Sequence, residues 1–393
     1  MKTFFTLAFC FITALALAQP FGVGKTTITF NDPARSNRAI TTEIYYPATY
    51  DGTNAPFAGA VGTKYPVVVF GHGFAMNVSS YANIWNALVP QGYIVALPTT
   101  EGSFFPNHTN FAKDLAFVAQ QLPLLSSQNG SLFQNRVSNK TCVMGHSMGG
   151  GAAVLAAQYN PAITVIAGLA SAETNPSAIA AAASVSKPVL LFDGSNDCVT
   201  PPSTNSLAIY NNLNASSCKT FVSINGGNHC YFANYNFNCS FGELTCSPSA
   251  TIGRATQQTL TDLVLKPFLN HYLKSKPNAL ANFIYRLDNT AGITYQRSCT
   301  NGSRLDETHV SSVMSAYPNP TSDMFTVSFQ SEVAMDMQCV VLDLSGRTVL
   351  QTVVSVTEGA NRFDTDCADW QSGVYLVYIV GNGTKQYTRV VKQ

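Results

Sequence analysis

Residues 145–149 read G-H-S-M-G, a pattern that could place the hydroxyl of Ser147 where it acts as a nucleophile. A short apolar run, residues 141–144, precedes the pattern, and the small-residue segment 149–153 begins at its last glycine. These flanks predict a buried strand, a sharp turn and a helix. A G-x-S-x-G nucleophile elbow requires this context, because the turn lifts the hydroxyl above the edge of the sheet. The alternative is a glycine-rich turn that contains a serine by chance, and the flanking segments favour the nucleophile.

A serine hydroxyl becomes a good nucleophile only when a base takes its proton and an acid orients that base. In folds built around such an elbow the acid follows the serine in the chain, and the histidine comes last. Three of the six histidines come after Ser147. His309 lies in a polar stretch and His271 in a long apolar helical segment, whereas His229 stands in a glycine-rich loop directly after a predicted strand. We therefore expect His229 to be the general base.

The orienting acid should lie just beyond the end of an earlier strand, and residues 192–197 offer both Asp193 and Asp197. Asp197 has the longer reach toward the histidine loop, so we expect it to be the acid. Asp193 is expected to cap the turn through its own backbone. Glu173, which follows an earlier predicted strand, is a third choice.

Two backbone N–H groups are needed to bind the oxyanion that forms during acyl transfer. The start of the helix after the nucleophile supplies the N–H of Met148, where the helix dipole adds positive potential. The loop after the first buried parallel strand, residues 71–74, supplies the N–H of Phe74. His72 lies in the same loop, and we expect it to brace the loop and not to act as a second base.

Strand and helix patterns alternate from Pro66 to Leu273, which predicts a doubly wound, mostly parallel sheet of the α/β class. Residues 26–30 and 42–46 alternate polar and apolar side chains, so they predict antiparallel strands ahead of that sheet. Ligands of such sheets bind at the carboxyl ends of the strands. The predicted position of Ser147 lies at one such end.

Composition divides the chain of 393 residues into four parts. Residues 1–18 combine a positive start, an apolar middle and a small-residue cleavage site, which indicates a signal peptide cut after Ala18. We expect residues 19–299 to form the catalytic domain and residues 300–315 a polar linker. Helix signals vanish in residues 316–393, where short strands separated by turns predict a small all-β sandwich.

Charge and composition limit the partners. The chain has 22 Lys and Arg against 21 Asp and Glu, a net charge of +1, and only 11% charged residues. This balance gives no indication of a nucleic-acid partner. No segment after the signal peptide approaches membrane-spanning length, and no Cys and His cluster has zinc-ligand spacing. We expect an exported, monomeric protein that requires no metal or other cofactor.

The cysteines indicate disulfides. Ten cysteines become nine when Cys10 leaves with the signal peptide, so at least one of the nine is unpaired within the chain. Export to an oxidising compartment favours disulfides for the others, and Cys142, in the strand before the nucleophile, is the expected free thiol. Cys218, Cys299, Cys339 and Cys367 are left without an assigned partner.

Four further cysteines lie near the predicted acid and base. Cys198 directly follows the acid and Cys230 directly follows the base, so we expect these two to bridge their loops. Cys239 and Cys246 are expected to close a local hairpin. The alternative is that Cys198 and Cys230 are unrelated and have other partners.

From Thr42 to about Cys299 the chain resembles the dienelactone-hydrolase-related esterases, which include bacterial cutinases and polyethylene terephthalate hydrolases. The matching segments are 45–47 (Y-Y-P), 73–74 (G-F), 145–150 (G-H-S-M-G-G), 196–201 (N-D-x-x-x-P) and 224–229 (I-N-G-G-N-H). The resemblance implies an α/β-hydrolase fold and a serine carboxylesterase that works through an acyl-enzyme. It also implies a substrate pocket lined by Phe74, His146, Met148 and Val199.

The chain departs from this family in the loop that follows the next strand after the elbow helix. That loop, residues 169–174, reads L-A-S-A-E-T and lacks the family's substrate-clamping tryptophan, and only Cys299 matches the family's C-terminal disulfide. We expect a short-acyl or aromatic ester as substrate, with a polyester such as cutin or polyethylene terephthalate as a further option. The cleft should be open, with residues 231–249 as the extended loop that shapes it.

Two other functions stay open. Residues 32–35 (D-P-A-R) and 44–47 (I-Y-Y-P) also resemble lipid acetylhydrolases of the same fold, so a lipid acetylhydrolase or lipase is an alternative. A catalytically silent surface-binding protein is the other alternative. The intact set of Ser147, Asp197 and His229 argues against a silent protein.

The tail resembles the sorting domain of type IX secretion in Bacteroidota. The matching segments are 317–320 (Y-P-N-P), 343–347 (D-L-S-G-R), 372–375 (S-G-V-Y) and the basic end near Lys392. The resemblance implies that the secretion machinery is a partner, and that the protein is secreted or held at the outer-membrane surface. The alternative is a polysaccharide-binding sandwich, but the aromatic residues of the tail lie mostly in predicted strands.

Overall fold

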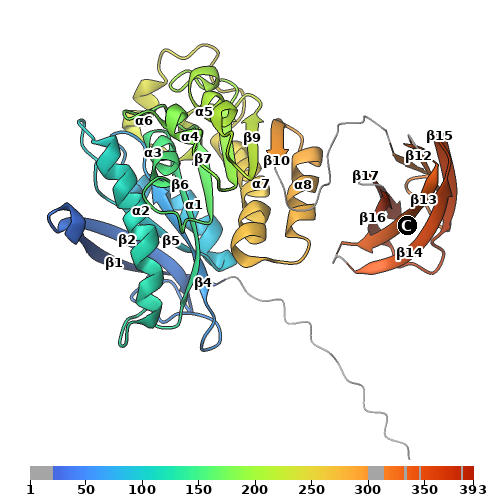
Figure 1. Ribbon diagram of the computed structural model, residues 1–393, viewed down its shortest axis with the longest axis horizontal. Coiled ribbons are helices and arrows are strands. Elements are labelled where there is room, and N and C mark those ends of the chain that lie inside the picture. Colours follow the sequence, from blue (N-terminus) through green and yellow to red (C-terminus); the bar gives the residue numbers. More distant parts are fainter. Residues whose placement is uncertain (1–20, 300–313, 332–333, 345–346, 382–383) are drawn as a thin grey trace, which may run out of the picture. The chain divides into compact units, whose positions relative to one another are not determined.

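The computed structural model describes two compact units, which fall within Met1–Thr300 and Asn301–Gln393 (Figure 1). The expected signal peptide and all but the last two residues of the expected linker lie outside the described residues. The described ranges are 21–299, 314–331, 334–344, 347–381 and 384–393.

The first unit is built on a ten-stranded sheet. Its strands are β1 (Gly22–Asp32), β2 (Arg38–Ala48), β3 (Gly52–Thr53), β4 (Tyr65–Gly71), β5 (Ile94–Pro98), β6 (Val137–His146), β7 (Val165–Leu169), β8 (Val189–Gly194), β9 (Cys218–Ile224) and β10 (Ile293–Cys299). Their spatial order is β10-β9-β8-β7-β6-β4-β5-β2-β1-β3. Along the spatial run β9-β8-β7-β6-β4-β5, each strand is parallel to its neighbour. The pairs β1–β2, β2–β5 and β9–β10 are antiparallel. The predicted α/β class and the antiparallel strands ahead of the parallel sheet are confirmed.

Helices cover both faces of this sheet (Figure 1). They are α1 (Ala82–Leu88), α2 (His108–Leu124), α3 (Met148–Ala156), α4 (Ala178–Ala182), α5 (Ser206–Asn212), α6 (Phe237–Gly242), α7 (Arg254–Lys274) and α8 (Ala279–Asn289). Short 3-10 turns are η1 (Pro33–Arg35), η2 (Val78–Tyr81), η3 (Val89–Gln91), η4 (Leu125–Ser127), η5 (Pro202–Thr204) and η6 (Cys230–Phe232).

Two apolar cores result, one on each face. In β4, Val67 and Val69 belong to the core that packs against α2 and α3, whereas Val68 and Phe70 belong to the core that packs against α1 and α7. This alternation follows from the strand geometry, in which successive side chains point to opposite faces. Because both faces are covered, the central strands are continuously apolar, as in other parallel sheets.

The second unit is a sandwich of two antiparallel sheets. Its strands are β11 (Ser315–Tyr317), β12 (Met324–Ser331), β13 (Met335–Asp343), β14 (Thr348–Val356), β15 (Gly359–Asp366), β16 (Gly373–Gly381) and β17 (Thr384–Lys392). One sheet has the order β11-β12-β15 and the other β14-β13-β16-β17. Side chains of both sheets, such as Phe325 from β12 and Val341 from β13, share one core. The predicted all-β tail is confirmed.

The parallel strands end at one edge of the sheet, and the loops that follow β4, β6, β8 and β9 lie there together. Ser147 directly follows β6, Asp197 follows β8, and His229 follows β9. This edge therefore carries the predicted catalytic residues. Within the described part of the chain, no helix is long and apolar enough to span a bilayer.

Candidate active site

Ser147 occupies the sharp turn between β6 and α3. Its backbone has φ 55° and ψ −122°, a combination that residues other than glycine rarely adopt. Such strained backbone conformations cluster at functional sites. The turn needs Gly145 and Gly149, because a Cβ on Gly149 would lie 2.1 Å from the carbonyl oxygen of Gly71 and one on Gly145 would lie 2.4 Å from the backbone of Gly149. The predicted strand, turn and helix are all present around the serine.

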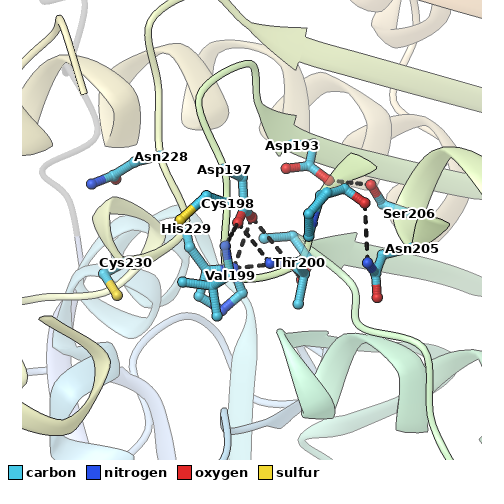
Figure 2. A network of polar contacts seen from close by, with 12 residues as sticks. Asp193, Asp197, Cys198, Val199, Thr200, Asn205, Ser206, Asn228, His229 and Cys230 are labelled. Carbon is cyan, nitrogen blue, oxygen red and sulfur yellow. Dashed lines mark hydrogen bonds and ion pairs between the residues drawn. The ribbon is translucent and has the colours of Figure 1, made fainter. Parts of the chain in front are cut away.

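His229 and Asp197 are in direct contact (Figure 2). The Nδ1 atom of His229 lies 2.8 Å from Oδ2 of Asp197, and both side chains are almost fully buried. Because a carboxylate accepts, Nδ1 carries the proton, and Nε2 of the neutral ring is left as the basic atom. His229 and Ser147 line the same pocket. The geometry therefore brings the predicted acid, base and nucleophile to one place.

The carboxyl group of Asp197 is held in its charged form. Burial alone would raise its pKa, but the His229 ring and the donors of Thr200 outweigh burial, so the pKa lies below its usual value. The backbone N–H groups of Val199 and Thr200 donate to Oδ1 at 2.9 and 2.8 Å. Asp197 can therefore orient the ring and stabilise the imidazolium that forms during proton transfer.

Asp193 and Glu173, the other acids considered, do not contact the His229 ring. Asp193 is fully buried, and its Oδ2 accepts a hydrogen bond from the hydroxyl of Ser206 (Figure 2). Burial and then the negative charge of Asp197 raise its pKa well above the usual value. Glu173 accepts from the backbone N–H of Ile179. The structure thus favours Asp197 as the orienting acid.

Thr200 is a site residue that the sequence reading missed. Its Oγ1 lies 2.9 Å from Nδ1 of His229 and 3.0 Å from Oδ2 of Asp197. The hydroxyl can donate to the carboxylate while it accepts from the ring N–H, so it fixes both partners. The sequence signal was the spacing D-x-x-T, in which the N–H groups two and three residues after Asp197 return to its carboxylate.

The N–H groups of Phe74 and Met148 are suited to bind an oxyanion. Met148 is the first residue of α3, whose initial N–H groups have no acceptor within the helix. Neither N–H donates a hydrogen bond to another described residue. The ring of His72, in the same loop as Phe74, lies 2.9 Å from the carbonyl oxygens of Gly73 and Thr100, one from each nitrogen. His72 therefore braces the oxyanion loop, as expected.

His146 does not line the pocket, which corrects the substrate contact expected from the resemblance. It is fully buried, with Nε2 at 3.0 Å from the carbonyl oxygen of His229 and Nδ1 at 2.9 Å from the hydroxyl of Tyr81. That hydroxyl in turn accepts from the backbone N–H of Gly73 at 2.7 Å. Burial, and then the neighbouring His229, lower the pKa of His146 to about 3. A neutral His146 therefore joins the oxyanion loop to the histidine loop through a chain of hydrogen bonds.

Side chains from two other segments hold the histidine loop. The Gln257 amide of α7, itself fully buried, bonds to both the N–H and the carbonyl of Asn228 at 3.0 and 2.8 Å. Glu243, just after α6, accepts from the N–H of Cys230 and from the Asn228 amide, both at 2.8 Å. Arg254 donates to the carbonyl of Cys230 at 2.5 Å. The backbone on each side of the base is therefore fixed by polar contacts.

The pocket above Ser147 has a volume of about 390 Å³ and mostly apolar walls. Phe74 and Val199, two residues predicted to bind substrate, line it and are 48% and 39% exposed. Met148, a third, is buried at 3% exposure and is absent from the lining, so its predicted side-chain contact is also corrected. Another wall of the pocket comes from residues 231–249, the loop that was expected to shape the cleft. This loop contains most of η6 and all of α6, and none of its residues was individually predicted to line the pocket. Its lining residues are Phe237, Asn238, Cys239, Phe241 and Gly242.

The disulfides differ from the predicted pairs. Cys198 and Cys230 do not pair with each other, and neither do Cys239 and Cys246. The acid and base loops are neighbours as expected, but the cysteine of each loop forms a disulfide with a residue in or just after α6. The bridges are Cys198–Cys246, Cys230–Cys239 and Cys218–Cys299.

The described cysteines outside the three disulfides are buried free thiols. Cys142 is a buried free thiol, as predicted, and burial raises its pKa far above the usual value. Cys339 and Cys367 are also buried and free. Among the described residues, no group of three His, Cys, Asp or Glu side chains is placed to hold a metal ion.

Residues 17–247 match the PET hydrolase-like family, and residues 315–393 match the secretion system C-terminal sorting domain. The chain is also similar to a bis(hydroxyethyl) terephthalate hydrolase of Streptomyces coelicolor, with 27% identity over 219 residues. That similarity covers 54% of this chain and 62% of the length of the relative. Both resemblances drawn from the sequence are confirmed, and the type IX sorting tail makes this a secreted or cell-surface protein.

Proposed function

We propose that this chain, which belongs to the PET hydrolase-like family, hydrolyses esters as a serine carboxylesterase through an acyl-enzyme on Ser147. One observation carries the proposal. A serine in a strained turn lines the same pocket as a histidine whose Nδ1 lies 2.8 Å from a buried carboxylate. This is the arrangement that acyl transfer by serine requires.

The proposed reaction has two halves. Oγ of Ser147 attacks the ester carbonyl while its proton passes to Nε2 of His229, and the imidazolium is stabilised by Asp197. His229 then returns the proton to the leaving alcohol as the carbon–oxygen bond of the ester breaks. Water next attacks the acyl-enzyme by the same proton route, which releases the acid and restores Ser147.

The oxyanion of each tetrahedral intermediate binds to the N–H groups of Phe74 and Met148. Both groups have no acceptor within the described protein, so no hydrogen bond is broken when they bind the charge. Donors that are oriented in advance stabilise the transition state more than the ground state. Loss of one donor of this kind costs on the order of 100–1,000-fold in turnover.

As substrate we propose an ester of an aromatic acid, met as a small diester or at the surface of a polyester. The name of the Streptomyces relative suggests bis(hydroxyethyl) terephthalate as the first compound to test. The pocket is compatible with this substrate, because its volume of about 390 Å³ suits a drug-sized molecule and four phenylalanines are among its lining residues. We further propose that residues 19–299 carry the activity after removal of residues 1–18, and that residues 316–393 serve export alone.

The proposal is tested by hydrolysis of p-nitrophenyl butyrate by the secreted protein and its Ser147→Ala variant. We expect at least a thousandfold loss of kcat. Ser138→Ala is the matched control, because Ser138 lies at the other end of β6, and it should retain wild-type kcat. Activity that survives Ser147→Ala would contradict the serine mechanism. A short-chain phospholipid cleaved better than bis(hydroxyethyl) terephthalate would favour a lipid acetylhydrolase.

A further inference from the structure

The pocket has an aromatic wall that the chemistry at Ser147 does not use. Phe237 and Phe241 of α6 line it, and their side chains are 69% and 65% exposed. They are four residues apart, so they share one side of the helix, and their ring centroids lie 6.3 Å apart. A second pair consists of Phe74 and Phe104, with centroids 6.1 Å apart and the rings edge to face. Exposed rings gathered at a catalytic pocket indicate a binding surface.

Covalent bonds hold α6 at the pocket. Cys239, within α6, is bonded to Cys230, the residue after the catalytic base. Cys246, just beyond α6, is bonded to Cys198, the residue after the catalytic acid. The helix is therefore tied to the loop of His229 on one side and to the loop of Asp197 on the other. A segment fixed at two points keeps its backbone in place before substrate arrives.

Polar contacts join the same helix to the oxyanion loop. The Asn238 amide donates to the carbonyl oxygen of Ala75 at 2.7 Å, one residue after the proposed oxyanion donor Phe74. Asn236 caps α6 by accepting from the N–H of Cys239, and its amide also donates to Ser80 at 3.1 Å. The position of α6 is thus set relative to the His229 loop, the Asp197 loop and the oxyanion loop. A wall fixed in this way can discriminate between substrates at little cost in ordering.

We propose that Phe237 and Phe241 form an aromatic clamp that binds an aryl ring of the substrate, and that this clamp makes the enzyme selective for aryl esters. The inference rests on the proposed function of Ser147. Phenyl rings favour edge-to-face or offset packing against another ring, and such packing rewards an aryl group more than a flexible alkyl chain.

The test compares two esters with the secreted full chain. One is bis(hydroxyethyl) terephthalate, which contains an aryl ring, and the other is ethyl butyrate, which contains none. In the double variant Phe237→Ala/Phe241→Ala, we expect kcat/KM for the aryl ester to fall about 5- to 100-fold, mainly through KM. The ratio of kcat/KM for the two esters should fall at least fivefold. Phe237→Tyr/Phe241→Tyr, which keeps both rings, should restore the ratio.

Leu244→Ala is the matched control, since Leu244 is 74% exposed on the same segment and does not line the pocket. The control should leave the ratio at the wild-type value. An equal loss on both esters, or no loss on the aryl ester, would overturn the clamp while the esterase itself stands. If the wild-type chain cleaves neither ester in a Ser147-dependent way, the proposed function fails first. Thermal unfolding of the double variant should match the wild type, because both rings are exposed.

Discussion

Removal of the Tyr81 hydroxyl should lower both the stability of the fold and the rate of catalysis. In Tyr81→Phe, the backbone N–H of Gly73 loses its acceptor and Nδ1 of His146 loses its donor, and all three residues are buried. A buried polar group left without a partner costs about 1–3 kcal/mol. The two groups together should lower the free energy of unfolding by about 2–6 kcal/mol. At about 2–4 °C per kcal/mol for a unit of this size, Tm should fall by about 4–24 °C.

The same change should slow catalysis, because Gly73 precedes the proposed oxyanion donor Phe74. A loop that has lost its anchor holds this donor less accurately, and small misplacements in an active site cost up to about 100-fold. We expect kcat for p-nitrophenyl butyrate to fall about 10- to 100-fold at a temperature at which the variant is folded. The assays are steady-state kinetics and circular dichroism melting.

Tyr65→Phe is the matched control for this prediction. Its hydroxyl is also buried and donates to the carbonyl oxygen of Ala58 at 2.8 Å, but it lies outside the site. This variant should lose stability and keep kcat within twofold. If Tyr81→Phe loses stability but keeps wild-type kcat, the hydrogen-bond chain does not hold the oxyanion loop. If its stability is unchanged, the chain does not form in solution.

Two further predictions concern the acid. Thr200→Val removes the hydroxyl that contacts His229 and Asp197 but keeps both backbone donors to Asp197. We expect kcat to fall about 3- to 30-fold, with KM nearly unchanged. Wild-type kcat in this variant would show that Thr200 does not help to hold the pair. For Asp197, the folded-state pKa lies below 3.8, the usual value of an Asp carboxyl, so its ionisation stabilises the fold above that pH and the contribution is lost as pH falls through the folded pKa. The Tm of the wild type minus the Tm of Asp197→Asn should therefore decrease as pH is lowered from about 5 to below the folded pKa. A difference that stays constant over this range would contradict a paired carboxylate.

The parts of the site that the sequence predicts are those with backbone constraints. The turn at Ser147 is predictable because it needs the glycines at 145 and 149, where an added Cβ would lie 2.4 and 2.1 Å from neighbouring backbone. The positions of His229 and Asp197 can be predicted because each residue follows an apolar strand of a parallel sheet, and such strands end at one edge. Periodicity and chain order suffice for these features.

The parts that the sequence does not predict depend on where side chains point. His146 ends β6, where successive side chains face opposite sides of the sheet, so its ring packs on Tyr81 and Phe232 and not in the pocket. Cys198 and Cys230 lie beside residues in contact, yet both bond to the α6 region. Their partners depend on the path of residues 231–249, which no periodic pattern defines.

The central claim, that Ser147 is the acylated nucleophile, is tested most directly by a covalent adduct. The chain is treated with diethyl p-nitrophenyl phosphate, and its peptides are analysed by mass spectrometry. We predict one diethylphosphoryl group on the peptide that contains Ser147, no adduct in Ser147→Ala, and much slower labelling in His229→Ala. An adduct on another residue that tracks the loss of esterase activity, or full inhibition with Ser147 unmodified, would contradict the account.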